Sequence, residues 1–261
     1  MASVSSRSIV FITGTFISNN CWDEWMSYFE NEGYKCIAPA WPHKDASPEE
    51  LRNQTAHDVI ASNTLTSLAD HFASIINALP ERPILVGHSL GGVVVQLLLQ
   101  QELGVAGVAI RSFPPNGVNR FWFSFLKAIW EAMVVLSSSK QTYLISFNKW
   151  RYTVANGVAY EQQKELYYRY AIPESKKIIR EAFNCAAKIN FSKPHAPLLI
   201  MSGSNDKLIP ASLNYINYKK YANGNSVTEY IEFKGHIHLV FGIPAWKEEA
   251  DCVFHWLQGL K

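Results

Sequence analysis

Short apolar segments alternate with longer amphipathic segments along most of the chain. The apolar segments have the length of buried strands, whereas the amphipathic segments repeat their apolar positions at helical spacing. The pattern predicts strands over residues 9–13, 34–41, 84–86, 105–111, 197–202 and 227–233, and helices over residues 23–32, 67–79, 90–103 and 245–260. Such alternation is typical of an α/β protein, so we expect a mostly parallel sheet of about six strands with helices on both faces.

Residues 114–195 interrupt this alternation. Aromatic side chains are frequent there and recur at helical spacing in two stretches, RFWFSFLKAIWEAMVVL and EQQKELYYRYAIPESKKIIREAFNCAAKI. We therefore predict a helical insertion over residues 114–195, within a core formed by residues 1–113 and 196–261. Most of the rings are expected to fill the core of the insertion, because large side chains serve that purpose. Rings that face a cleft instead would line an apolar pocket.

Charge and cysteine usage exclude several classes of protein. The 24 basic and 22 acidic residues give a formal net charge of +2 and are scattered, which argues against a nucleic-acid partner. The four cysteines form no zinc spacing and no C-x-x-C pair, which favours free thiols in a reducing compartment. The apolar runs are too short for a signal peptide or a membrane span. We expect a cytoplasmic monomer or homodimer that binds neither nucleic acid nor membrane.

The stretch ILVGHSLGGVVVQ places a serine in a turn between a predicted strand and a predicted helix. Gly87, His88, Ser89, Leu90 and Gly91 match the pattern G-x-S-x-G. In this context the pattern predicts a nucleophile elbow, in which glycines make room for a strained serine. The strain lifts the Ser89 hydroxyl above the carboxyl end of the sheet, where the start of the helix directs backbone N–H groups at developing negative charge.

A serine hydroxyl is a weak nucleophile at neutral pH and needs a base, which in turn needs an acid to hold its tautomer. The loop after the strand expected at residues 197–202 supplies Asp206. The loop after the last expected strand supplies His236 and His238. A metal site at the two histidines is disfavoured, because the sequence offers no third ligand beside them. The residues therefore predict a catalytic triad of Ser89, Asp206 and one of the two histidines.

The chain resembles α/β-hydrolase fold proteins, in particular small hydrolases with an inserted helical cap, in the stretches GHSLGG, SGSNDKLIP and GHIHLVFGIPAWKEEADCVFHWL. The resemblance covers nearly the whole chain and implies that the insertion is the cap. In some members the catalytic histidine lies eight residues before a tryptophan that opens the last helix, and Trp246 then selects His238. In other members the histidine directly follows a glycine, which would select His236. Spacing favours His238 and leaves His236 as the alternative base.

The resemblance also implies an oxyanion hole with two backbone donors. One is the N–H of Leu90, next to the nucleophile, and the other is expected from Thr15 in the loop after the first strand. Family members usually have His-Gly where this chain has Thr13 and Gly14, so the hydrogen bonds that brace this loop are expected to differ. Phe16 would form a wall of the pocket or donate in place of Thr15.

We therefore expect a serine hydrolase that cleaves carboxylic esters or lactones of small to medium apolar substrates through an acyl-enzyme, with no metal and no organic cofactor. Proteins of the same fold include hydroxynitrile lyases, cofactor-free peroxidases and oxygenases, and triad-bearing receptors, so these remain alternatives. A lyase would be expected to place a lysine of the cap over the nucleophile, and the candidates are Lys127, Lys140 and Lys149. The residues expected in the substrate pocket are Phe16, His88, Trp122 and Phe125.

Overall fold

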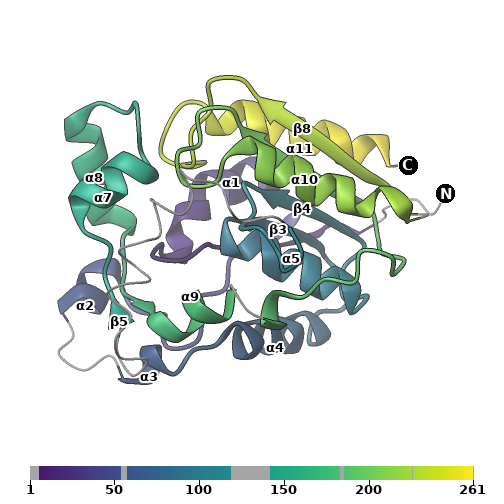
Figure 1. The fold of residues 1–261 in the computed structure, drawn as a ribbon, viewed down its shortest axis with the longest axis horizontal. Helices are drawn as coiled ribbons and strands as arrows, with labels where there is room; N and C mark the ends of the chain where they lie inside the picture. Colours follow the sequence, from purple (N-terminus) through teal and green to yellow (C-terminus); the bar gives the residue numbers. More distant parts are fainter. Residues whose placement is uncertain (1–5, 54–57, 119–141, 183–184, 225, 261) are drawn as a thin grey trace.

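Six parallel strands form the centre of the computed structural model, which describes residues 6–53, 58–118, 142–182, 185–224 and 226–260. The strands are β1 (Ser8–Ile12), β2 (Lys35–Ile37), β3 (Ile84–His88), β4 (Ala106–Ile110), β7 (Leu198–Gly203) and β8 (Thr228–Phe233). Their order across the sheet is β2-β1-β3-β4-β7-β8, and every neighbouring pair is parallel. Helices cover both faces of the sheet (Figure 1), so the predicted fold class is confirmed.

Successive residues of a strand point to opposite faces, and in β1 this divides the buried residues between two clusters. Ile9 and Phe11 belong to the first cluster, whereas Val10 and Ile12 belong to the second. The helices that cover the first face are α1 (Asp23–Asn31) and α11 (Trp246–Gly259). The helices that cover the second face are α4 (Leu65–Asn77), α5 (Leu90–Gln100) and α10 (Ala211–Lys220).

Local signals explain where two of these helices begin and end. Helix α1 stops before Gly33, which has a φ of 83° that few other residues adopt. Helix α4 begins earlier than its apolar pattern predicts, because Thr64 and Ser67 form a capping box. Each of the two hydroxyls accepts a hydrogen bond of 2.9 Å from the backbone N–H of the other residue.

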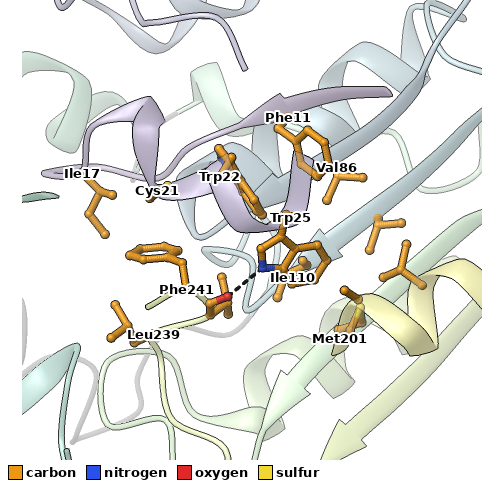
Figure 2. Packing of buried hydrophobic residues seen from close by; sticks show 14 of the residues in the cluster. Phe11, Ile17, Cys21, Trp22, Trp25, Val86, Ile110, Met201, Leu239 and Phe241 are labelled. Carbon is orange, nitrogen blue, oxygen red and sulfur yellow. Dashed lines mark hydrogen bonds between the residues drawn. The ribbon is translucent and has the colours of Figure 1, made fainter. Parts of the chain in front are cut away.

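The first buried cluster is rich in aromatic rings and extends from α1 to the loop that follows β8 (Figure 2). The rings of Trp22 and Phe11 lie 5.0 Å apart between centroids. The indole N–H of Trp25 donates a hydrogen bond of 2.8 Å to the carbonyl oxygen of Val240. This bond holds residues 234–241, here called the β8 loop, against the helix at the start of the chain.

In the segment between β4 and β7, the helices at residues 147–153 and 160–170 lie beyond the carboxyl ends of the strands (Figure 1). The segment contains β5 (Thr142–Tyr143), α7 (Phe147–Thr153), α8 (Tyr160–Tyr170), β6 (Glu174–Ser175), α9 (Lys176–Ala182) and the 3-10 helix Cys185–Ala187. Strands β5 and β6 pair in an antiparallel sheet where the sequence predicted only helix. Helix α8 ends at Tyr170, because Pro173 disfavours helical conformation in the residue before it. The helix expected at residues 120–136 lies outside the described residues.

Several short elements were not predicted. They are α2 (Pro48–Asn53), α3 (Asp58–Ala61) and the 3-10 helices Asn19–Trp22 and Tyr221–Asn223. Elements of this length are too short to show a periodicity in the sequence. Helix α10 was also missed, because its apolar residues do not gather on one side. Conversely, β2 is shorter than the strand expected at residues 34–41.

The cysteines whose side chains the structure describes are free thiols, namely Cys21, Cys36 and Cys252. Burial raises the pKa of Cys36 to about 12 and also raises the pKa of Cys21 and Cys252. All three thiols are therefore protonated and poorly nucleophilic at neutral pH. Among the described residues, no helix combines the length and the apolar character that crossing a membrane requires.

Candidate active site

Ser89 occupies a strained turn between β3 and α5. Its backbone angles are φ 56° and ψ −118°, a conformation that costs a non-glycine residue about 1–3 kcal/mol. A Cβ atom on Gly87 would collide with the carbonyl group of Gly91, and a Cβ atom on Gly91 would collide with the carbonyl group of Ile12. Glycine is therefore required at both positions, because the turn brings backbone into direct contact with backbone.

Hydrogen bonds fix the Ser89 backbone in this conformation. Its N–H donates to the carbonyl oxygen of Ile110 at 2.9 Å. Its own carbonyl oxygen accepts from the N–H groups of Gly92 at 3.0 Å and Phe113 at 2.9 Å. The serine is thus held by α5, by the end of β4 and by the chain that follows β4.

The structure brings Asp206 and His238 together. Asp206 follows β7, His238 lies in the β8 loop, and Oδ2 of the aspartate is 2.7 Å from Nδ1 of the histidine. The second carboxylate oxygen, Oδ1, accepts hydrogen bonds from the N–H groups of Leu208 at 2.8 Å and Ile209 at 2.7 Å. Because a carboxylate accepts hydrogen bonds, Nδ1 carries the proton and Nε2 is left with a lone pair. His238 and Ser89 line the same cavity.

His236 lies in a different environment from His238. Its Nδ1 is 2.6 Å from Oε1 of Glu249, and its Nε2 is 3.2 Å from Oε2 of Glu248. Glu249 is buried and receives two hydrogen bonds from Arg111, at 2.8 and 2.5 Å. The aspartate after β7 is therefore paired with His238, and His236 is paired with glutamates of α11.

The charges in this second cluster shift one another's pKa values. Burial alone would raise the pKa of Glu249, but the Arg111 guanidinium and the bond to His236 outweigh burial and lower it. The hydrogen bond to Glu249 raises the pKa of His236, which stabilises the imidazolium form of that ring. A cation at His236 and an anion at Glu249 thus stabilise each other where the β8 loop contacts α11.

His88 does not line the cavity, which corrects the expectation from the sequence. Its side chain is fully buried, and its ring lies 4.7 Å from the His238 ring and 5.7 Å from the Phe241 ring, between centroids. Burial, and then the neighbouring His238 and Arg111, lower the pKa of His88 well below its usual range. His88 is therefore neutral, and its Nε2 donates a 2.9 Å hydrogen bond to the carbonyl oxygen of His238.

The cavity, counted together with the open solvent at its mouth, spans about 810 Å³, and its walls are almost entirely apolar. Of the residues named from the sequence, it is lined by Thr15, Phe16, Ser89, Leu90, Lys149 and His238. Sequence analysis missed the remaining lining residues, which are Ile17, Phe113, Tyr143, Ile145, Trp150, Thr153, Val154, Ile179, Ala182, Leu208 and Ile209. The i, i+3 and i, i+4 spacings within α7 and α9 mark an apolar face, but they do not show what that face covers. The predicted Trp122, Phe125, Lys127 and Lys140 lie outside the described residues.

Residues 13–16, here called the β1 loop, pass directly over Ser89. A Cβ atom on Gly14 would lie 2.7 Å from the Cβ atom of Ser89, so glycine allows this approach. Thr15 lines the cavity, and Phe16 follows with a φ of 66°. The N–H of Phe16 donates to Oε2 of Glu174 at 3.3 Å, so this amide is already engaged by a carboxylate.

Acyl transfer requires a nucleophile, a base held by an acid, and backbone amides that stabilise an oxyanion. Ser89, the buried pair of Asp206 and His238, and the amides at the start of α5 and in the β1 loop are the candidates for these parts. The described residues contain no group of three or more histidine, cysteine, aspartate or glutamate side chains that could hold a metal ion.

The chain matches the profile of the alpha/beta hydrolase family over residues 9–244. A monoacylglycerol lipase from Paleococcus ferrophilus superposes with a TM-score of 0.70 at 18% identity, over 97% of this chain and 95% of its own. An extracellular alpha/beta-hydrolase from a Paenibacillus species superposes with a TM-score of 0.66 at 20% identity, over 94% and 98%. Polyneuridine aldehyde esterase superposes with a TM-score of 0.66 at 16% identity, over 96% of this chain and 99% of its own. Among curated proteins no match was found.

The pairing of His236 with Glu249 predicts a pH dependence of stability. An unfolded histidine has a pKa of about 6.5, and folding raises the pKa of His236. A raised pKa contributes stability that is fully present below the unfolded value and is lost as the pH rises through the folded value. We therefore expect His236→Gln to lower the free energy of unfolding more at about pH 5.5 than at about pH 9, measured by urea denaturation.

His255→Gln is the matched control, because that ring is exposed and its Nδ1 bonds to the backbone carbonyl oxygen of Asp251 and not to a buried carboxylate. It should change the free energy of unfolding by less than about 0.5 kcal/mol at either pH. An equal effect of His236→Gln at both pH values would show that the charge on the His236 ring contributes nothing.

Proposed function

The chain belongs to the alpha/beta hydrolase family, and we propose that it hydrolyses carboxylic esters or lactones of small to medium apolar compounds through an acyl-enzyme on Ser89. The observation that carries the proposal is the 2.7 Å contact between Asp206 and His238, buried beside the cavity that Ser89 also lines. Structural neighbours described as esterases and lipases support hydrolysis as the general activity.

In the proposed acylation step, His238 Nε2 takes the proton of the Ser89 hydroxyl as Oγ attacks the acyl carbon. The carbonyl oxygen becomes an oxyanion, which the backbone N–H groups of Leu90 and Thr15 stabilise. Asp206 stabilises the imidazolium that forms on His238. When the tetrahedral intermediate collapses, the bond to the alkoxy oxygen breaks and the leaving alcohol takes the proton from Nε2.

Deacylation uses the same groups with water as the nucleophile. His238 Nε2 removes a proton from the water, whose oxygen attacks the acyl carbon on Ser89 Oγ. Collapse of the second intermediate releases the carboxylic acid and returns the proton to Oγ. In a lactone the leaving alcohol stays attached to the acyl group, so the product is a single hydroxy acid.

The walls of the cavity support an apolar acyl group. Tyr143, Ile145, Trp150 and Ile179 surround the space in front of Ser89, and hydrocarbon buried against them leaves water. One structural neighbour is described as a methylesterase and another as a pyrethroid hydrolase, and both descriptions support a hydrolytic activity.

One observation favours a second candidate function, that of a hydroxynitrile lyase. Lys149 on α7 lines the cavity together with Ser89 and His238. A lysine near the nucleophile is expected in a lyase of this fold. A cationic ammonium would stabilise the cyanide that leaves a cyanohydrin. The apolar remainder of the cavity suits an ester equally well, so the two functions are separated by assay.

We also propose a reducing, cytoplasmic compartment. The free thiols of Cys21, Cys36 and Cys252 support this location, because secreted proteins of this size tend to oxidise their cysteines to disulfides.

Ser89→Ala should lower kcat/KM for a soluble aryl ester at least ~10³-fold, because nucleophile, base and acid act as one unit. Asp206→Asn should lower kcat/KM nearly as much, because the amide holds the wrong tautomer of His238. His238→Ala should match Ser89→Ala, whereas His236→Ala should cost no more than about tenfold through a displaced β8 loop.

His255→Ala controls for loss of an exposed imidazole and should retain full activity. An inactive His236→Ala beside an active His238→Ala would reverse the assignment of the base. A Ser89→Ala variant within about tenfold of the unchanged chain would exclude the covalent mechanism.

Esters with longer acyl chains should have a higher kcat/KM, up to a length limit set by the cavity. Each buried methylene contributes up to about 0.8 kcal/mol, or about fourfold in kcat/KM. A series of p-nitrophenyl esters from acetate to decanoate measures this slope. Trp150→Ala should move the optimum to longer chains, because the fully buried indole is part of the wall. The same kcat/KM for every ester would show that the aromatic rings fill the core only.

Assay of cyanohydrins separates hydrolase from lyase. We expect the unchanged chain to hydrolyse aryl esters and to release no aldehyde from mandelonitrile above the uncatalysed rate. If the chain were a lyase, it would release aldehyde, and Lys149→Met would abolish that release while Lys164→Met, at an exposed position on α8, would not. Aldehyde release with no ester hydrolysis would replace the proposed function by the second one.

A further inference from the structure

A buried ion pair connects the chain after β2 to strand β6 of the insertion. Lys44 Nζ lies 2.6 Å from Oε2 of Glu174, and the two side chains are only 3% and 0% exposed. Buried charges of this kind carry a large desolvation cost, so they contribute little to stability compared with apolar side chains of similar size. The pair is therefore of interest for what its carboxylate holds in place.

The carboxylate of Glu174 binds the β1 loop as well as Lys44. Oε2 accepts the N–H of Phe16 at 3.3 Å, and Oε1 accepts the N–H of Ser175 at 2.8 Å. Both oxygens are thus engaged by backbone N–H groups, one of them in the loop that passes over Ser89. Lys44 Nζ contacts the same oxygen, Oε2, so the carboxylate is buried beside a basic group and not among apolar side chains alone.

Phe16 needs such a partner because its φ of 66° is unfavourable for a side chain of this kind. The rest of the contact between loop and insertion resembles strand pairing. The carbonyl oxygen of Phe16 accepts the N–H of Ile172 at 2.9 Å, and the N–H of Ser18 donates to the carbonyl oxygen of Tyr170 at 2.9 Å. Glu174 adds a further hydrogen bond to this contact through the N–H of Phe16.

We infer that Glu174, compensated by Lys44, is a positioning residue that orients the Thr15 amide for the oxyanion through its hydrogen bond to the N–H of Phe16. The peptide plane between Thr15 and Phe16 follows directly on the plane that carries the Thr15 N–H. Fixing the Thr15–Phe16 plane limits rotation of the Gly14–Thr15 plane, so the Thr15 N–H is oriented before substrate binds. The inference rests on the proposed function, and it makes the insertion part of the catalytic geometry as well as a wall of the pocket.

Two double variants test this role. Glu174→Gln with Lys44→Met removes both charges and keeps a side-chain oxygen that can accept the Phe16 N–H. Glu174→Leu with Lys44→Met removes both charges and the acceptor. Neither leaves a buried charge without its partner. Arg52→Met is the matched control, because Arg52 Nη1 donates to the carbonyl oxygen of Ala171 at 2.7 Å and is a separate tether to the insertion.

The Leu double variant should lose between about 10- and 100-fold in kcat for a soluble aryl ester, with KM within about threefold. Its affinity for a trifluoromethyl ketone should fall by a similar factor, because the adduct with Ser89 carries the oxyanion. The Gln double variant and Arg52→Met should keep kcat within about threefold. Thermal unfolding of all three variants shows whether a loss of kcat follows stability.

The inference is overturned if the folded Leu double variant keeps kcat, if it raises KM in place of lowering kcat, or if the Gln double variant loses as much. Should the Leu variant fail to fold, Glu174→Met with Lys44→Met provides a second apolar pair with the same expectations. If the unchanged chain neither hydrolyses esters nor binds the ketone, the proposed function fails and the inference fails with it. Normal hydrolysis with no loss in the variants refutes the inference alone.

Discussion

The turn between β3 and α5 leaves no space for a side chain at Gly87 or Gly91, and the arrangement of the site follows from this constraint. At this turn the start of α5 lies against β1 and β3 with backbone close to backbone. Ser89 must therefore adopt a conformation that few residues tolerate, and its carbonyl group and N–H are fixed by hydrogen bonds to neighbouring segments. The parallel order of the strands then brings the loops after β1, β7 and β8 to the same edge.

The two loops that face Ser89 are each held by a buried carboxylate. Glu249 binds His236 in the β8 loop, and Glu174 binds the N–H of Phe16 in the β1 loop. Each carboxylate is paired with a buried cation, which lowers the cost of its burial. The two carboxylates come from α11 and β6, so segments remote in sequence from Ser89 set the geometry around it.

Sequence analysis predicted what depends on local pattern. The strands of the main sheet and the turn at Ser89 follow from apolar runs and glycine spacing, and both could be located without a structure. The choice between the two histidines depends on which carboxylate meets which ring, and Glu249 lies on a helix that the sequence assigned only to the core. The β5 and β6 pairing and the wall of the cavity likewise arise from tertiary contacts between short segments, which no periodicity reveals.

The ion pair between Arg111 and Glu249 joins residues 138 positions apart and has a consequence for synthesis of the chain. A growing chain that ends before α11 already contains Ser89, Asp206 and both histidines. It lacks Glu249, the carboxylate that pairs with Arg111 in the folded chain, so a native fold would enclose a guanidinium without its partner, which is strongly unfavourable. The native arrangement of the site is therefore favoured only once α11 is part of the chain.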